Sequence, residues 1–78
     1  MKDFTTKFNL ILKNEDMTPT KMSEISGITR TAASDYKIGR SIPSVQNLIK
    51  IINAFPKYTL YILDLDAREL PQQTFLKN

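Results

Sequence analysis

The apolar residues near the start of the chain follow the spacing of an amphipathic helix. Within residues 3–14 they are separated by four, three and one positions, which places them on one helical face: Phe4, Phe8, Ile11 and Leu12. Asp3 stands just before them, as an N-cap or a first-turn acid that interacts favourably with the helix dipole. The pattern predicts a first helix whose apolar face lies in the core.

Two shorter helices are predicted next, over residues 18–25 and 29–37, with a tight turn between them. Thr18 and Thr29 are suited to be their N-caps, because a threonine hydroxyl accepts a backbone N–H of the first helical turn. Gly27 stands between them, where a C-cap with a positive φ is needed.

The apolar positions of these two helices give each an inner face. Met22 and Ile25 share a face of the first helix, and Ile28 follows the turn as a buried plug. In the second helix the inward side chains are expected to be Ala32, Ala33 and Tyr36. The outward side chains are then Arg30, Thr31, Ser34 and Asp35. A short helix, a glycine turn and a second helix that starts with small polar residues are typical of a helix-turn-helix, although two short helices of any small α domain also fit.

The most apolar segment of the chain follows Pro43. Ser44 is a suitable N-cap, and the apolar residues after it predict the central core helix: Val45, Leu48, Ile49, Ile51, Ile52 and Phe55. Pro56 restricts the residue before it, so this helix is expected to end near Ala54.

The residues that define these elements occur in a fixed order: Thr18, Met22-Ser23, Gly27-Ile28-Thr29, Ala33, Gly39-Arg40, Pro43-Ser44 and Leu48. Over residues 17–54 this order resembles the Cro/phage-repressor (XRE-type) helix-turn-helix family. The resemblance implies an all-α fold, a compact bundle of four to five short helices of the lambda-repressor-like DNA-binding type. It also implies a helix over residues 58–65, where the Tyr, Thr, Ile and Leu content alone favours a strand.

The outward side chains of the second motif helix are the expected contacts with base edges of double-stranded DNA. Arg30 can donate two hydrogen bonds to guanine O6 and N7, Thr31 and Ser34 can touch a thymine methyl or a base edge, and Asp35 can accept from cytosine N4. For Asp35 an ordinary ion pair within the helix is the competing interpretation. For the others the alternative is a surface side chain that meets only phosphate or water.

A second set of polar and basic residues is expected to contact the DNA backbone: Thr20, Lys21, Thr29, Lys37, Arg40, Ser41 and Ser44. Members of the family often pair a Glu at the place of Lys37 with an Arg at the place of Leu12. That pair is missing from this sequence, so Lys37 is expected to be free for a phosphate.

Composition limits the remaining function classes. The chain of 78 residues contains no cysteine and no histidine, which excludes a thiol nucleophile, a catalytic triad and the usual zinc sites. Its net charge of +3 is compatible with DNA binding without establishing it. No membrane span, secretory signal, cofactor, metal or small-molecule substrate is expected, and the protein is expected to be cytoplasmic and not an enzyme.

The chain is divided into a helix-turn-helix domain over residues 1–66 and a C-terminal tail over 67–78, interpreted as a possible dimerisation arm. The apolar residues near this end exceed what a small core needs and are the expected homodimer contact: Leu60, Tyr61, Leu63, Leu65, Leu70, Phe75 and Leu76.

These observations favour a sequence-specific DNA-binding transcriptional regulator, Cro-like or repressor-like, that binds operator DNA as a dimer with its third helix in the major groove. An antitoxin or a restriction–modification controller of the same fold remains open. So does a protein-interaction module such as an antirepressor.

Overall fold

The chain folds into five α-helices and one short 3-10 helix within the residues that the computed structural model describes, 3–63 and 76. The elements are α1 (Phe4–Asn14), α2 (Pro19–Ser26), α3 (Arg30–Ile38), α4 (Val45–Ala54), η1 (Pro56–Tyr58) and α5 (Thr59–Leu63). No strand occurs in this part of the chain, which confirms the all-α prediction. The segment 58–65 is helical through Leu63, and the last two residues of that prediction lie outside the described residues.

Threonine and serine caps start the three central helices. The Oγ atoms of Thr18, Thr29 and Ser44 each accept a backbone N–H three residues later, at 3.2, 3.0 and 3.2 Å. Gly27 and Gly39 end α2 and α3 with φ values of 89° and 80°. The caps at Thr18, Gly27, Thr29 and Ser44 agree with the sequence-based prediction because each depends on residues that are close neighbours in the chain.

The start of α1 differs from the prediction. Asp3 does precede the helix, but its backbone is left-handed, with a φ of 60°, and its side chain makes no capping hydrogen bond. The carbonyl of Asp3, not its carboxylate, is used here: it accepts the N–H of Lys7 at 3.1 Å. Asp3 therefore contributes no side-chain cap to α1.

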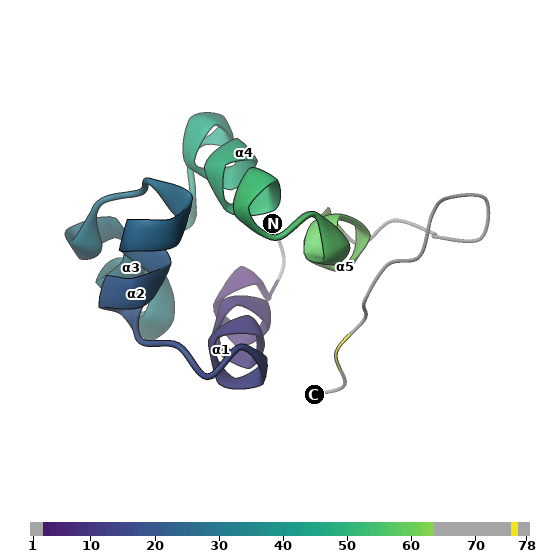
Figure 1. Ribbon diagram of the computed structural model, residues 1–78. Helices are drawn as coiled ribbons and strands as arrows, with labels where there is room; N and C mark the ends of the chain where they lie inside the picture. The colour runs from purple at the N-terminus through teal and green to yellow at the C-terminus, as the bar shows by residue number, and fades with distance from the viewer. Residues whose placement is uncertain (1–2, 64–75, 77–78) are drawn as a thin grey trace.

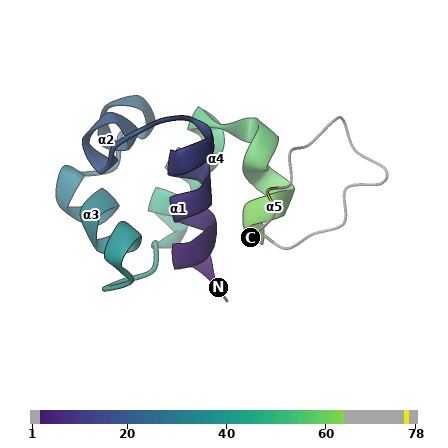
Figure 2. The ribbon, with the colours of Figure 1, turned by 90° about the horizontal axis from the view of Figure 1, so that it is seen from below.

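The helices are arranged around α1. The α2–α3 pair lies on one side of it and α5 on the other, in two views at right angles (Figure 1 and Figure 2). α3 packs against both α1 and α2, and α4 packs against α2 and η1. Lys7 of α1 donates to the carbonyl of Tyr61 at 2.8 Å, which ties α1 to α5.

One hydrophobic core joins all of these elements. Its fully or nearly fully buried members include Phe4, Phe8, Ile11, Leu12, Met22, Ile28, Ala33, Tyr36, Ile51, Tyr58, Tyr61 and Ile62. The rings of Phe4 and Phe8 meet the ring of Tyr36 edge to face, with centroids 5.6 and 5.7 Å apart. The α1 stripe, the Ile28 plug and the inner face of α3 are thus confirmed as core.

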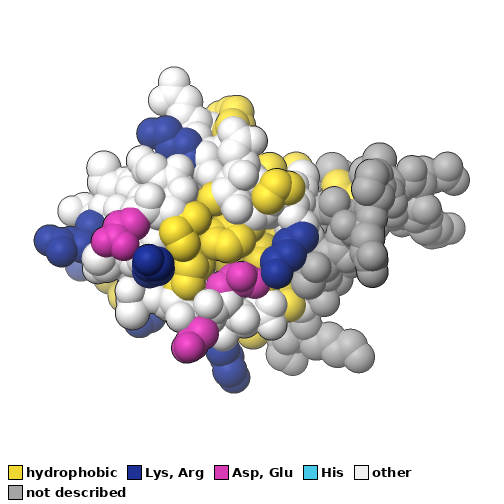
Figure 3. Space-filling model, viewed as in Figure 1, with side chains coloured by type: hydrophobic (Ala, Val, Ile, Leu, Met, Phe, Trp, Pro, Cys, Tyr) yellow, Lys and Arg dark blue, Asp and Glu magenta, His cyan; other side chains and the backbone are white. Residues whose placement is uncertain are grey.

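The prediction of a central core helix at residues 44–55 is only partly right. Ile51 is buried, but Val45 and Ile49 are 73% and 51% exposed. They stand four residues apart on the side of α4 that faces away from Ile51, and the described residues leave at least half of each exposed. Ile25, expected on the inner face of α2, is also 46% exposed. Figure 3 shows hydrophobic side chains gathered near the middle of one face, with charged side chains around them.

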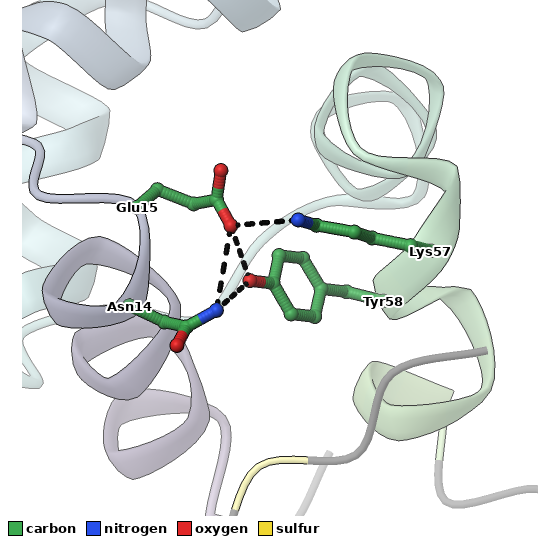
Figure 4. A network of polar contacts seen from close by, with 4 residues as sticks. All are labelled: Asn14, Glu15, Lys57 and Tyr58. Carbon is green, nitrogen blue, oxygen red and sulfur yellow. Dashed lines mark hydrogen bonds and ion pairs between the residues drawn. The ribbon is translucent and has the colours of Figure 1, made fainter.

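A polar cluster joins the end of α1 to η1 (Figure 4). The hydroxyl of Tyr58 donates to Glu15 Oε2 at 2.5 Å and accepts from Asn14 Nδ2 at 2.6 Å, and Lys57 Nζ lies 3.0 Å from the same carboxylate oxygen. Hydrogen bonds from Tyr58 and Lys57 lower the pKa of Glu15 below its ordinary value of 4.5. Burial, and then the bond to Glu15, raises the pKa of Tyr58 above 10.0.

Candidate nucleic-acid interface

The outward face of α3 is polar and accessible. Arg30, Thr31 and Ser34 are exposed, while Ala33 and Tyr36 on the opposite side are 0% and 3% exposed. The three outward residues fall in the first five positions of the helix, the part that reaches base edges when such a helix enters the major groove. Two of them are short, so the backbone of α3 can approach a base closely while Arg30 spans a longer distance.

Asp35 occupies a different environment from these three residues. Its side chain is 24% exposed, and its carboxylate Oδ1 lies 3.6 Å from the guanidinium Nη1 of Arg40. The structure therefore pairs two residues that were expected to contact DNA separately, one at a base and the other at a phosphate. The ion-pair interpretation of Asp35 is the one that this geometry favours, although its partner lies beyond the helix end.

Most of the expected backbone contacts lie at helix ends. Thr20 and Lys21 are exposed in the first turn of α2, and Thr29 is exposed at the N-cap of α3. The Thr29 hydroxyl accepts a backbone N–H of α3, so its O–H can still donate to another acceptor. Helix N-termini also present backbone N–H groups and a partial positive charge, which favour bound phosphates.

The remaining expected backbone contacts follow α3 and reach the start of α4: Lys37, Arg40, Ser41 and Ser44, all exposed. Lys37 makes no ion pair with any described residue. Leu12, at the other place of that pair, is 4% exposed and belongs to the core. Lys21, in contrast, is partly neutralised by Glu24, 3.8 Å away.

Three hydrogen bonds fix α3 and the turn before it to the neighbouring helices. The hydroxyl of Ser23 in α2 donates to the carbonyl of Ile28 in the turn at 2.7 Å. Asn47 Nδ2 in α4 donates to the hydroxyl of Tyr36 at 2.8 Å. Asn9 Nδ2 in α1 donates to the carbonyl of Lys37 at 2.8 Å, one of the last carbonyls of α3.

Sequence reasoning missed two kinds of residue at this surface. Ile38 is 64% exposed and follows Thr31 and Ser34 on the outward face, at a helical spacing that was visible in the sequence. Asn9 and Lys37 are 28 residues apart, and no local pattern indicates that they meet. The position of Ile38 could therefore be predicted from the sequence, whereas the contact between Asn9 and Lys37 depends on tertiary structure.

Several residues expected at the homodimer contact are buried within the domain itself. Leu60 and Tyr61 are 5% and 6% exposed inside their own domain, so they have little surface left for a second copy. Leu63 is half-buried. Leu76 is also half-buried and packs against the core. The other expected contacts, Leu65, Leu70 and Phe75, lie outside the described residues.

The described residues offer little for other chemistry. No group of three or more His, Cys, Asp or Glu side chains within residues 3–63 and 76 is placed to hold a metal ion. None of the helices in this part of the chain is long and apolar enough to cross a membrane. An open hollow of about 410 Å³ beside α1 is lined by Leu10, Lys13, Asn14 and Leu76 and gathers no reactive side chains.

Comparison with known proteins identifies the family. No curated protein and no solved structure gives a significant match to this chain. The family model described as Helix-turn-helix matches residues 10–62, which cover α2, α3, α4 and η1, the C-terminal part of α1 and all of α5 except Leu63. The chain therefore belongs to the XRE-type, Cro/phage-repressor helix-turn-helix family of DNA-binding regulators.

Proposed function

We propose that this protein is a sequence-specific transcriptional regulator of the Cro-like or repressor-like kind, which occupies operator DNA as a dimer. In this proposal α3 enters the major groove. The observation that carries it is the outward face of α3, where Arg30, Thr31 and Ser34 are exposed on a helix of a DNA-binding family.

Arg30 has the longest reach of the three. Its guanidinium presents parallel N–H donors that match O6 and N7 of guanine, a contact that contributes about 1–3 kcal/mol of discrimination against a wrong base. Thr31 and Ser34 lie on the same face and add hydroxyl contacts, and Thr31 also has a methyl group for thymine. In this proposal three side chains, from about one and a half turns of α3, recognise the bases.

The phosphate contacts in this proposal surround α3 on both sides. Thr20, Lys21 and Thr29 lie at the starts of α2 and α3, whereas Lys37, Arg40, Ser41 and Ser44 lie between the end of α3 and the start of α4. Contacts on both sides of the helix fix its register on the duplex, since phosphate contacts position a protein without reading sequence.

The dimer in this proposal follows from the size of the reading helix. A nine-residue α3 spans only a few base pairs, and operators of helix-turn-helix proteins usually repeat their half-sites about 34 Å apart. Two copies related by a two-fold axis would place two α3 helices on the same side of the duplex.

Enrichment of bound sequences from a pool of random duplexes tests the proposal. The expected result is a short motif repeated with two-fold symmetry at a spacing of about one helical turn. The salt dependence of binding provides a second measure: about four to eight phosphate contacts give a steep negative slope of log affinity against log salt, about 0.9 per contact. A pool that yields no common motif, with binding indifferent to salt, would favour a protein-interaction module instead.

A further inference from the structure

The hydroxyl of Tyr36 joins the reading helix to the start of α4. It accepts a hydrogen bond of 2.8 Å from Asn47 Nδ2, and these two residues are 11 positions apart, on either side of the loop between α3 and α4. Tyr36 is 3% exposed, whereas Asn47 is half-buried. The bond is therefore partly shielded from water, where a hydrogen bond is stronger and its loss costs more.

Both partners of this bond are themselves held in place. The ring of Tyr36 packs edge to face against Phe4 and Phe8 of α1, which fixes its position independently of its hydroxyl. Asn47 stands in the first turn of α4, and its backbone N–H is bound by the Ser44 hydroxyl at 3.2 Å. The bond thus connects the core side of α3 to Asn47 in the first turn of α4, whose backbone is in turn bound by Ser44, the cap residue that the proposed function assigns to a phosphate.

α1 holds the same end of α3 by a second contact. Asn9 Nδ2 donates to the carbonyl of Lys37, which follows Tyr36 in the chain. It also donates to the carbonyl of Thr5 in its own helix at 2.9 Å. Two amide side chains, from α1 and α4, therefore restrain the last turn of α3 at consecutive residues. Of the two, the Tyr36–Asn47 bond is the one that crosses directly to the proposed phosphate-contacting segment.

We propose that Asn47 and the hydroxyl of Tyr36 are positioning residues for base recognition. Their bond fixes the distance between α3, which reads bases, and the start of α4, which contacts the backbone. Without it, phosphate contacts still form on any duplex, but α3 no longer meets the base edges in the same register. This inference rests on the proposed function, and it assigns specificity to two residues that do not touch DNA.

The experiment compares Tyr36→Phe, Asn47→Ala and the double variant with the wild type. Tyr36→Phe removes only the hydroxyl and leaves the ring in its aromatic contacts. Asn53→Ala is the matched control, since Asn53 is an exposed asparagine on the same helix. Each protein is titrated with a duplex enriched from the random pool and with a duplex of the same composition in shuffled order, well below its unfolding temperature. Thermal unfolding of each variant is recorded in parallel.

We expect each single variant to bind the enriched duplex about three- to tenfold more weakly and the shuffled duplex unchanged, the range that one hydrogen bond contributes. The double variant should lose no more than either single variant, because both changes remove the same bond. Asn53→Ala should bind like the wild type.

Three outcomes would overturn the inference: equal losses on both duplexes, additive losses in the double variant, or a lower unfolding temperature with unchanged binding. If the wild type itself prefers no sequence, the proposed function fails before the variants are compared. If the wild type is selective and the variants are equally selective, only this inference fails.

Discussion

Gly27 allows α2 and α3 to follow each other with only three residues between them. Its φ of 89° is left-handed, and no described atom beyond Gly27 and its two chain neighbours lies within 4 Å of the position that a Cβ would occupy. The cost of a side chain here is therefore backbone strain alone. We expect Gly27→Ala to lower the free energy of unfolding by about 1–2 kcal/mol, and Gly27→Asn to lower it less, because asparagine tolerates this conformation. Urea unfolding measures both, and an alanine variant as stable as the wild type would contradict the account.

Arg30 and Lys37 are expected to differ in the kind of DNA contact that they make. Arg30→Ala should cost about 1–3 kcal/mol on the enriched duplex and little on shuffled DNA, because a base contact carries sequence information. Lys37→Ala should weaken both duplexes alike and reduce the salt slope by about one contact. Equilibrium titrations at several salt concentrations measure the affinity of each variant for each duplex and its salt dependence. Equal losses for Arg30→Ala on the two duplexes would reassign Arg30 to the backbone.

The Asp35–Arg40 pair is expected to weaken DNA binding in general. The guanidinium of Arg40 lies 3.6 Å from the carboxylate, so a phosphate must compete with Asp35 for it. Asp35→Asn should strengthen binding to enriched and shuffled duplexes alike, by up to about fivefold, which corresponds to the roughly 1 kcal/mol limit for an exposed ion pair. Asp16→Asn is the matched control, since Asp16 is an exposed acid that forms no ion pair with any described residue. A loss confined to the enriched duplex would show instead that Asp35 accepts a hydrogen bond from a base.

At the scale of elements, the Glu15–Tyr58–Lys57 contacts join the α1–α2 connection to η1. The pKa of Glu15 is lowered by hydrogen bonds from Tyr58 and then Lys57, so its carboxylate is more acidic in the folded state than in the unfolded state. Its contribution to stability is present above the ordinary value of 4.5 and is lost as the pH falls through the lowered pKa.

Glu15→Gln should therefore be less stable than the wild type at about pH 7, and the two should converge as the pH falls through the lowered pKa and the wild-type carboxylate becomes protonated. Urea unfolding across this range measures the difference. Lys13→Gln is a suitable control, since Lys13 is exposed at the end of α1, close to Glu15 in the chain, and takes no part in the cluster. A difference between Glu15→Gln and wild type that is independent of pH would mean that the lowered pKa contributes no stability.

The elements that could be predicted from the sequence are those fixed by neighbouring residues. Thr18, Thr29 and Ser44 cap helices through bonds that span three residues, and Gly27 and Gly39 end them by their own backbone conformation. Burial was less predictable. Val45 and Ile49 have the same apolar character as Ile51, and only the packing of α4 on α2 determines which side chain is covered. Leu60 and Tyr61 were assigned to a partner for the same reason.

The candidate site shows the same division. Arg30, Thr31 and Ser34 could be placed outward because Ala33 and Tyr36 indicate the inner face of α3. The Asn9 and Asn47 contacts with α3 could not be predicted, since an asparagine forms such bonds wherever the fold brings a carbonyl or hydroxyl close to it.

At the scale of the whole molecule, few of the described residues expected at the dimer contact are exposed enough to meet a second copy. Leu60 and Tyr61 are used inside the domain, while Leu65, Leu70 and Phe75 lie outside the described residues. We expect the full chain to sediment as a dimer and a variant lacking residues 67–78 to remain folded, sediment as a monomer and lose affinity for the enriched duplex. Since Leu76 packs against the core, that variant should also unfold at a somewhat lower temperature. A full chain that stays monomeric at high micromolar concentration, both free and on DNA, would refute the dimer.

Recognition of base sequence by α3 is tested most directly by the ratio of equilibrium affinities for the enriched and the shuffled duplex, both measured at one salt concentration near physiological. If α3 reads base sequence, the enriched duplex should bind at least about a thousandfold more tightly, the lower end for specific protein–DNA complexes. A ratio near one, with affinity that falls steeply with salt for both duplexes, would contradict it: the protein would then bind the DNA backbone alone.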